Sequence, residues 1–523
     1  MPTIIHGDRV YARLDADAIL VNGGRVVAVG HHTDLADPGH REERFPGATI
    51  VPGLVDAHFH PTAYTGALQR LSLKATADFS DLLDQLRATS SLLPPGETLI
   101  GVRLDDETMA ERALPTRALL DQAATARPIL LYRYCGHIAV TNTAALELAG
   151  VTSGTPDPPG GSFDRDDTGA PTGVLRETAI GVVSAAVGDR AAGLTPAQTV
   201  EASRLLAATG LTALGAIVSP GESLLCDGSN ELQLVIDAAP DLALPLSVLV
   251  ATESPDELTT AAEMLERAGR RVRFHGLKLF SDGSLGGHTA ALFEPYADEP
   301  STWGTHRLPM EVALPVALRA LDLGGAVAIH AIGDAAVSHV LDIFERLIER
   351  GGDPAQLRME HVSVIRGDDI GRMAALGVTA SIQPAFLASE AVWLPKRLGE
   401  SRLRNAYAFN SMRDAGIPLA GGSDCPVEPP HPLHGIAAAI DRHGIVPQEA
   451  VTTDAAFAMF TTGAARAIGM PEPLSPGAPA NLTVIDGDPA TMTPSQIRNA
   501  GVLATFIEGE IPAPPSGGSD WPG

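Results

Sequence analysis

The chain has 523 residues, 45% of them hydrophobic but only 4% aromatic, so it is long enough for a barrel of ~250 residues with additions, packed mainly by aliphatic side chains and alanine. Its formal net charge of −26 would repel nucleic-acid phosphates and anionic lipid, so we expect neither as a partner. The three cysteines, Cys135, Cys226 and Cys425, lie far apart without a CxxC motif, the N-terminus does not resemble a signal peptide, and no apolar run reaches the ~18 residues of a membrane span; these features predict a soluble, cytoplasmic protein.

Both ends of the chain have sequence patterns typical of short β-strands joined by glycine turns. Residues 3–51 contain AILVNGGRVVAVG, and residues 480–510 contain ANLTVIDGDP and VLATFIEGE. Because the termini of compact proteins often meet in space, we predict that residues 1–51 and 470–512 form one composite β-sandwich. Residues 513–523 are rich in Pro, Gly and Ser and are expected to be a flexible tail.

The middle of the chain alternates short apolar strands with Ala/Leu-rich helical patterns. The strand candidates are residues 50–60, 211–217, 244–250, 273–280, 326–330, 357–361, 378–384 and 417–424. Helical patterns lie between most of them, at residues 196–209, 257–269, 311–323, 335–350 and 367–376. This alternation predicts an α/β fold, a (β/α)8 TIM barrel built from residues 52–71 and 191–469. Residues 72–190 then form a large insertion after strand one, which we expect to cover the barrel mouth.

Polar side chains fall at the ends of these predicted strands, and the ends of barrel strands are where catalytic residues gather. The residues are His58, His60, Lys278, His330, His361 and Asp424. Each alone could be structural, but the joint pattern predicts a metal site. Side chains alternate along a strand, so His58 and His60 point the same way and can share one ion, while His330 and His361 can hold a second. Imidazole nitrogen suits zinc and similar divalent metals.

Lys278 and Asp424 complete the predicted centre. Lys278 is one of only three lysines among 37 Lys and Arg residues, and it lies in an apolar strand. Burial favours the neutral amine, which can react with carbon dioxide to give a carbamate, an oxygen ligand able to bridge two metals. The alternative is a lysine that reaches out to water. Asp424 is expected to bind metal and to act as the acid–base group.

The order of these residues resembles that of the amidohydrolase superfamily. Longer stretches resemble its amidohydrolase-3 branch, which includes N-substituted formamide deformylases: VPGLVDAHFHP, CGHIAVTNTAAL, GAPTGVLRE, LKLFSDGSLGGHTAAL, HAIGDAAV, MEHVSV, SIQP and LAGGSDCPVEP. The resemblance implies the barrel and the β-sandwich of joined termini. It also implies hydrolysis of a non-peptide C–N bond, of the amide or formamide type, in a small molecule by metal-activated hydroxide. One or two divalent ions, most often zinc, would serve, with Lys278 N6-carboxylated and Asp424 catalytic. A homodimer is common for such folds.

Three residues are candidates for contact with the substrate. His137 in CGHIAV would contact the substrate carbonyl, although a buried structural histidine is an equal alternative, and the other two are His288 in GGHTAAL and Gln383 in SIQP. Related sequences often carry arginine at the position of His288. Asn481 replaces the aspartate usual in the family and lies in the predicted β-domain, so it should leave the chemistry untouched. Cys425 is expected to be a small packing residue.

Two other functions compete with this hypothesis. A mononuclear deaminase of a nucleobase-like ring would carry a glutamate a few residues after His330, but HAIGDAAV offers Asp334 instead. A non-catalytic scaffold with the same fold would not need to keep all six candidate ligands.

Overall fold

Eight parallel strands form the central barrel of the computed structural model, which describes residues 1–516 except 12, 14, 125, 135, 159, 189–192 and 222–230. Neighbours in the sheet follow the order β20-β19-β18-β17-β16-β15-β14-β7. The strands are β7 Leu54–Phe59, β14 Leu211–Val218, β15 Leu246–Ala251, β16 Val272–Phe280, β17 Ala326–Ala331, β18 Leu357–His361, β19 Thr379–Ile382 and β20 Leu419–Gly421. The ring closes between β7 and the segment after β20, where the Asp424 N–H donates to the His58 carbonyl (2.9 Å) and the His60 N–H donates to the Cys425 carbonyl (3.1 Å). The predicted barrel is therefore confirmed.

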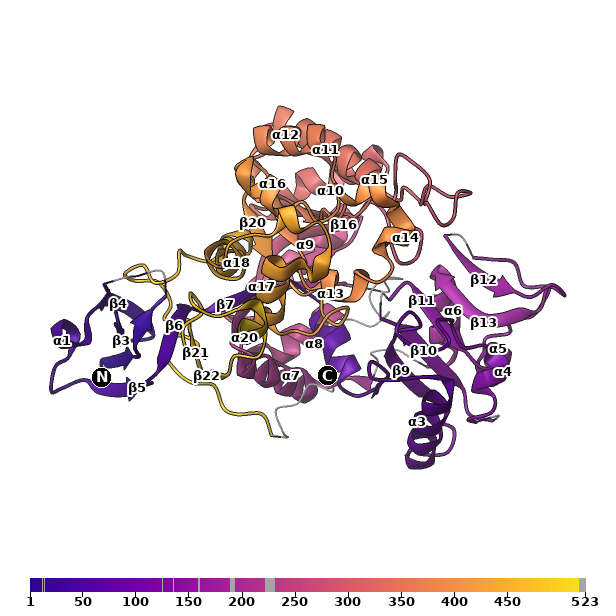
Figure 1. Cartoon of the computed structure of the whole chain (residues 1–523), viewed down its shortest axis with the longest axis horizontal. Coiled ribbons are helices and arrows are strands. Elements are labelled where there is room, and N and C mark those ends of the chain that lie inside the picture. Colours follow the sequence, from indigo (N-terminus) through magenta and orange to yellow (C-terminus); the bar gives the residue numbers. More distant parts are fainter. Residues whose placement is uncertain are drawn as a thin grey trace.

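Helices surround the barrel strands (Figure 1). The main ones are α7 Pro196–Ala208, α8 Glu231–Ala238, α9 Pro255–Arg267, α10 Met310–Asp322, α11 Asp334–Glu349, α12 Gly367–Leu376, α16 Phe409–Asp414 and α17 Pro432–Asp441. Local sequence sets their ends. At the start of α7, Thr195 and Gln198 form a reciprocal capping box, with Pro196 at the first helical position. Helix α12 ends at Gly377, whose left-handed backbone (φ 71°) suits glycine.

The stretch expected to be one strand, residues 50–60, is two strands in two different sheets. Strand β6 (Ala48–Pro52) pairs with β21 (Leu482–Asp486), whereas β7 belongs to the barrel. The chain passes between the sheets at Gly53, whose N–H donates to the Asn481 carbonyl (2.9 Å). A Cβ at this position would lie 2.4 Å from the Thr212 hydroxyl oxygen, so only glycine fits there. Hydrophobicity runs unbroken across the junction because both strands are buried.

Two four-stranded sheets flank the barrel on one side, at the left of Figure 1. One has the order β4-β3-β1-β5 and the other β2-β6-β21-β22, so the second joins strands from both ends of the chain. The remaining strands are β1 Thr3–His6, β2 Arg9–Val10, β3 Ala18–Asn22, β4 Arg25–Gly30, β5 Arg41–Arg44 and β22 Val502–Phe506; the short helix α1 (His32–Leu35) lies between β4 and β5 in the chain. Buried side chains from both sheets, including Ile5, Ile19, Ile50, Leu482 and Phe506, form one apolar cluster.

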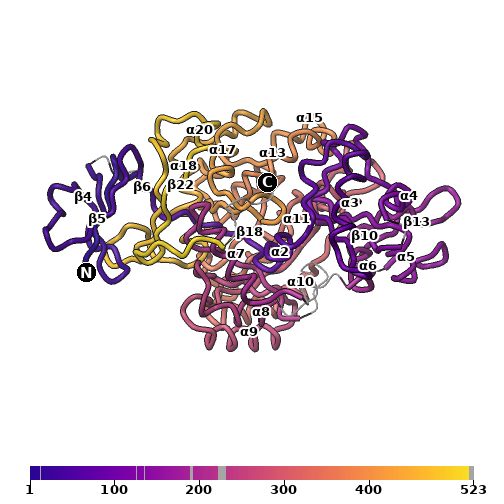
Figure 2. The backbone as a smooth tube through the Cα atoms, turned by 90° about the horizontal axis from the view of Figure 1, so that it is seen from below, coloured from indigo at the N-terminus to yellow at the C-terminus, as the bar shows by residue number. Residues whose placement is uncertain are grey.

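The segment after α2 (Pro61–Ala67) forms a separate sheet at the other end of the molecule, and both views place it opposite the terminal sheets (Figures 1 and 2). Its order is β12-β13-β11-β10-β9-β8. The elements are β8 Leu71–Ser72, α3 Phe79–Leu92, β9 Leu99–Leu104, α4 Arg117–Leu120, β10 Ile129–Arg133, β11 Ile138–Thr141, α5 Thr143–Leu148, β12 Gly161–Arg165, β13 Pro171–Glu177 and α6 Thr178–Ala186. Ion pairs join it to segments that follow barrel strands: Glu177 to Arg307 (2.9 Å) and Glu107 to Lys396 (3.3 Å). The insertion therefore reaches the end of the barrel where the carboxyl ends of the strands lie.

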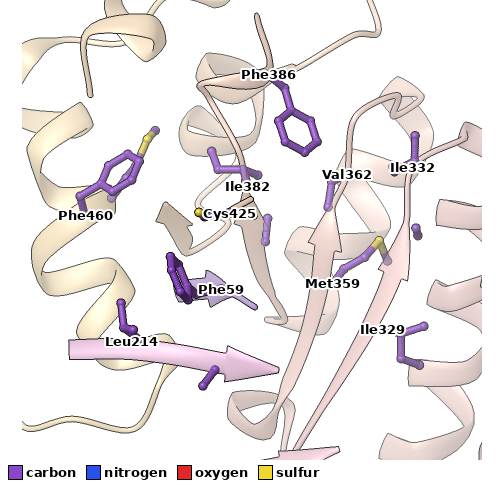
Figure 3. Packing of buried hydrophobic residues seen from close by; sticks show 14 of the residues in the cluster. Phe59, Leu214, Ile329, Ile332, Met359, Val362, Ile382, Phe386, Cys425 and Phe460 are labelled. Carbon is purple, nitrogen blue, oxygen red and sulfur yellow. The ribbon is translucent and has the colours of Figure 1, made fainter. Parts of the chain in front are cut away.

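The main apolar core fills the space between the barrel strands and their helices (Figure 3). Phe59, Met359, Ile382 and Phe460 belong to it, and Cys425 is buried among them. Within the described residues, no helix combines the length and the apolarity that crossing a membrane requires. Cys135, Cys226 and residues 517–523 of the expected tail lie outside the described residues.

Candidate metal centre

The closing seam of the barrel brings two histidines and a carboxylate together. His58 is the second-last residue of β7, His60 follows that strand directly, and Asp424 follows β20. Oδ1 of Asp424 lies 3.3 Å from Nε2 of His58 and 3.1 Å from Nε2 of His60. The two backbone hydrogen bonds across this seam hold the three side chains in register. His58 and His60 are paired as expected from their spacing along the strand. Asp424, more than 360 positions away, adds a third candidate metal ligand.

His361 and His330 extend the cluster along the strand ends. The His361 ring centroid lies 4.8 Å from that of His58 and 4.5 Å from that of His330. One ligand atom each from His58, His361 and Asp424 lie within 4.8 Å of one another. The backbone is strained here, since His361 (φ 73°), Val362 (φ 50°) and Asp424 (φ 56°) all occupy the left-handed region. Such strain persists where the surroundings fix a side chain in one direction, as they do at these strand ends.

Hydrogen bonds assign the ring nitrogens of three histidines. Nδ1 of His58 lies 2.5 Å from the Glu360 carboxylate, and Nδ1 of His361 lies 2.7 Å from the Gln383 amide oxygen. Nε2 of His330 lies 3.1 Å from the Gly283 carbonyl. Each of these acceptors requires N–H on the ring nitrogen that faces it, so in the neutral form of each ring the opposite nitrogen carries the lone pair. Neutral imidazoles oriented in this way are the usual metal-binding form, so the donor set fits a divalent cation.

Glu360 was not predicted as a functional residue, although β18 contained the signal. Arg358 and Glu360 occupy alternate positions in LRMEH, and two charged side chains inside a buried strand require a partner. The Arg358 guanidinium binds both carboxylate oxygens of Glu360, at 2.5 and 3.1 Å. Burial opposes ionisation of Glu360, but the Arg358 charge and the hydrogen bonds from His58 and Arg358 outweigh it and hold the carboxyl pKa well below its usual range. An ionised Glu360 therefore fixes the orientation of the His58 ring.

Two more buried carboxylates accept hydrogen bonds from backbone N–H groups near the candidate ligands. Asp56 accepts hydrogen bonds from the backbone N–H groups of His58 (3.1 Å) and Ser423 (3.0 Å). Asp282 accepts from three backbone N–H groups at 2.8–3.0 Å and lies 3.2 Å from Nε2 of His330. Neither residue was expected from the sequence. Asp56 is on β7, two residues before His58, and Asp282 is in the loop that follows β16.

Lys278 lies on β16 with a side chain only 1% exposed. Its Nζ is 4.5 Å from the Phe280 ring centroid, and the Phe280 ring in turn lies 5.7 Å from His330. Burial lowers the pKa of His60, and the Lys278 charge acts in the same direction, as it does on His330 and His361. Lys278 is therefore near enough to the histidine cluster to act on it electrostatically.

The three expected substrate contacts lie in different settings. Nδ1 of His137 is 2.9 Å from the Glu177 carboxylate, at the junction between the insertion and the barrel loops. Nε2 of His288 is 3.1 Å from Asp298. Within the described part of the chain, only Gln383 of the three hydrogen-bonds a metal-ligand candidate, His361. Contact of these residues with a substrate stays a prediction.

The chain is similar to known proteins over almost its whole length. The amidohydrolase family matches residues 46–512. The chain belongs to the amidohydrolase family. It is similar to YtcJ of Bacillus subtilis, with 32% identity covering 98% of this chain and 99% of that protein, and to the N-substituted formamide deformylase of Arthrobacter pascens, with 29% identity covering 95% and 94%. Among solved structures it resembles an uncharacterized metal-dependent hydrolase from Pyrococcus horikoshii, with a TM-score of 0.74 and 26% identity over 95% of this chain and 99% of that one.

Two further residues of this amidohydrolase-family chain have clear structural roles. Cys425 follows Asp424 but is fully buried in the apolar cluster, and burial raises the pKa of its thiol well above the usual range. Such a thiol is a packing group and a poor nucleophile. Asn481 accepts a hydrogen bond from the Glu508 N–H (2.9 Å) and lies just before β21, remote from the histidines in the fold.

Proposed function

We propose that the protein is a metal-dependent hydrolase of a non-peptide C–N bond, of the amide or formamide type, in a small molecule. The observation that carries the proposal is the shared position of Asp424, whose Oδ1 lies 3.1 and 3.3 Å from the Nε2 atoms of two histidines. Similarity over almost the whole chain to an N-substituted formamide deformylase supports the choice of bond.

In this proposal His58 and His60 hold one divalent ion, and His330 and His361 hold a second. Lys278, carboxylated on Nζ, would supply oxygen ligands between them. Nitrogen and carboxylate oxygen donors suit zinc, which we propose as the metal. When bound, such an ion polarises a carbonyl group and lowers the pKa of water to about 7.

Asp424 is the proposed proton carrier. Burial opposes its charge, but His58, His60 and His361 outweigh burial and hold the carboxyl pKa well below its usual range, so the group is an ionised carboxylate. It would take the proton from the attacking water and deliver it to the nitrogen as the C–N bond breaks. An amine is a poor leaving group without that proton, whereas an activated ester departs as a stable anion. Asp424 therefore matters most for amides.

The contacts of Asp334 do not favour the alternative function as a deaminase. Asp334 occupies the place where a deaminase would need an acid near His330. Its carboxylate instead accepts a hydrogen bond from the Phe293 N–H (3.1 Å), at the start of α11. This contact ties Asp334 to a loop outside the histidine cluster.

The test is a panel of N-formyl and N-acyl amines, carbamates and activated esters, with metal content measured on the same purified protein. Asp424→Asn should lower kcat on amides by at least about 10²-fold, the usual scale of acid–base catalysis, and much less on activated esters. Cys425→Ala is the matched control, since it alters the adjacent residue only in a side chain that packs in the apolar core, and it should keep near-normal rates. Hydrolysis of esters alone, with every amide, formamide and carbamate left intact, would overturn the choice of bond.

A further inference from the structure

A second cluster of histidines and a carboxylate lies in the terminal sheet β4-β3-β1-β5, away from the barrel. His6 ends β1, His32 begins α1, and Glu42 is on β5. Nε2 of His6 lies 3.8 Å from Oε2 of Glu42, and Nε2 of His32 lies 3.4 Å from Oε1. One ligand atom from each of the three residues lies within 4.8 Å of the others. Three separate elements thus converge on one point.

The architecture explains why these side chains face each other. Strands β1 and β5 are parallel neighbours, with Ile4 opposite Glu42 and His6 opposite Arg44. Side chains two apart on a strand share a face, so His6 and Glu42 lie on the same side of the sheet. Asp17 fixes the third element, because its carboxylate accepts a hydrogen bond from the backbone N–H of His32 (2.6 Å) at the start of α1. The two imidazole rings then stack, with centroids 4.1 Å apart.

The distances suit a shared ion better than direct hydrogen bonds. Four ligands at ~2.0–2.1 Å around a tetrahedral zinc ion lie about 3.3–3.4 Å from one another. The 3.4 Å between Nε2 of His32 and Glu42 matches this spacing, and the 3.8 Å between Nε2 of His6 and Glu42 is longer. A hydrogen bond from a ring nitrogen to a carboxylate would be about 2.7–2.9 Å. Both Nε2 atoms are shielded from solvent, and neither has a hydrogen-bond partner within the described residues. Buried polar atoms without partners are uncommon and require an explanation.

Charge also favours a cation at this point. Burial lowers the pKa of His6, and the neighbouring His32 acts in the same direction, so the ring is neutral at pH 7 and offers a lone pair. Metal ions bind that neutral form. Glu42 supplies a negative charge, and its side chain is 50% exposed, which leaves an open path from solvent.

We propose that His6, His32 and Glu42 bind one divalent transition-metal ion of the zinc class, with a fourth position open to water. The ion would link β1, α1 and β5. Strand β5 is the edge of its sheet, has the sequence REER, and buries none of its side chains fully, so it has little apolar packing of its own. A metal clip across this edge is a structural site, and it does not depend on the proposed hydrolysis.

The experiment uses full-length protein without a polyhistidine tag and zinc alone as the probe. A first variant, His58→Ala/His60→Ala, weakens binding in the barrel, and a second adds His32→Gln and Glu42→Gln to it. Zinc titrated against a competing chromophore should show a site in the first variant whose affinity falls at least about tenfold in the second, since losing even an indirect support of a ligand costs 10–100-fold. His31→Ala, which removes the exposed neighbour of His32, is the matched control and should leave the affinity unchanged.

A second readout separates the clip from adventitious binding. In otherwise wild-type protein, His32→Gln/Glu42→Gln should leave hydrolysis unchanged, which also reports correct folding of the barrel. Zinc should slow hydrogen exchange of residues 41–44 in the wild type and have no effect on them in this variant. Equal zinc affinity with and without His32 and Glu42, or exchange in β5 that ignores zinc in the wild type, would overturn the proposal.

Discussion

Replacing Glu360 with glutamine tests whether the buried ion pair of Arg358 and Glu360 stabilises both the barrel interior and the metal centre. Glu360 is 0% exposed and Arg358 is 2% exposed, and the guanidinium also donates to the Ala57 carbonyl (2.8 Å) and the Ser381 hydroxyl (3.1 Å). The substitution keeps the shape and one acceptor oxygen but removes the negative charge, leaving a buried cation without its counter-charge. Breaking a buried ion pair from one side costs about 3–5 kcal/mol, and the retained acceptor favours the lower end of that range.

The stability assay is urea unfolding of metal-free protein, followed by tryptophan fluorescence and circular dichroism, whose transitions should coincide. Glu349→Gln is the matched control, because Glu349 forms a similar contact with Arg346 (2.9 Å) on the surface. An exposed pair of this kind is worth less than ~1 kcal/mol. The double variant Arg358→Met/Glu360→Gln removes both charges and should cost less than Glu360→Gln alone.

The same substitution should weaken metal binding. Glu360 orients His58, and loss of such a partner lowers metal affinity by about 10–100-fold. Zinc titration of Glu360→Gln checks this directly. A stability loss no larger than that of Glu349→Gln, together with unchanged zinc affinity, would refute the view that Glu360 supports both the barrel interior and the metal centre.

Three further predictions follow from other parts of the barrel. Lys278→Ala should lower metal content and activity, and short carboxylates should partly restore both by supplying the missing oxygens; full metal content and a near-normal rate would rule out a bridging role. Gly276→Ala places a Cβ about 2.0 Å from the Ala326 carbonyl oxygen and should destabilise the protein by at least the ~1–3 kcal/mol typical of overpacking, whereas Gly367→Ala, with open space around it, should have little effect on the melting temperature. Burial raises the pKa of Glu390 to about 8 from its ordinary value of 4.5, so the folded protein retains a proton that the unfolded chain releases. Its contribution to stability is therefore complete below about pH 4.5 and is lost as the pH rises toward 8. Glu390→Gln should flatten this part of the melting-temperature profile, and parallel profiles for the two proteins would contradict the assignment.

The amino-acid sequence was sufficient to place the barrel strands and the candidate ligands at their ends. Most of the strands are short, buried and mainly apolar runs, and parallel strands of one barrel all end at the same rim. A polar residue that closes such a run must therefore lie near the others, whatever the lengths of the connections. The spacing of His58 and His60 needed no tertiary information, because alternation along a strand is a local property of the backbone.

The sequence pattern did not predict contacts between residues that are far apart in the chain. The division of residues 50–60 at Gly53 depends on how closely Thr212 approaches, and hydrophobicity does not report such a distance. The carboxylate of Glu360 meets His58 across 302 residues, and it is recognisable as a partner only when β18 and β7 face the same interior. His6, His32 and Glu42 have no spacing typical of a metal site. Their convergence results from the pairing of β1 with β5 and the position of α1, since side chains from separate elements meet only after the backbone has packed.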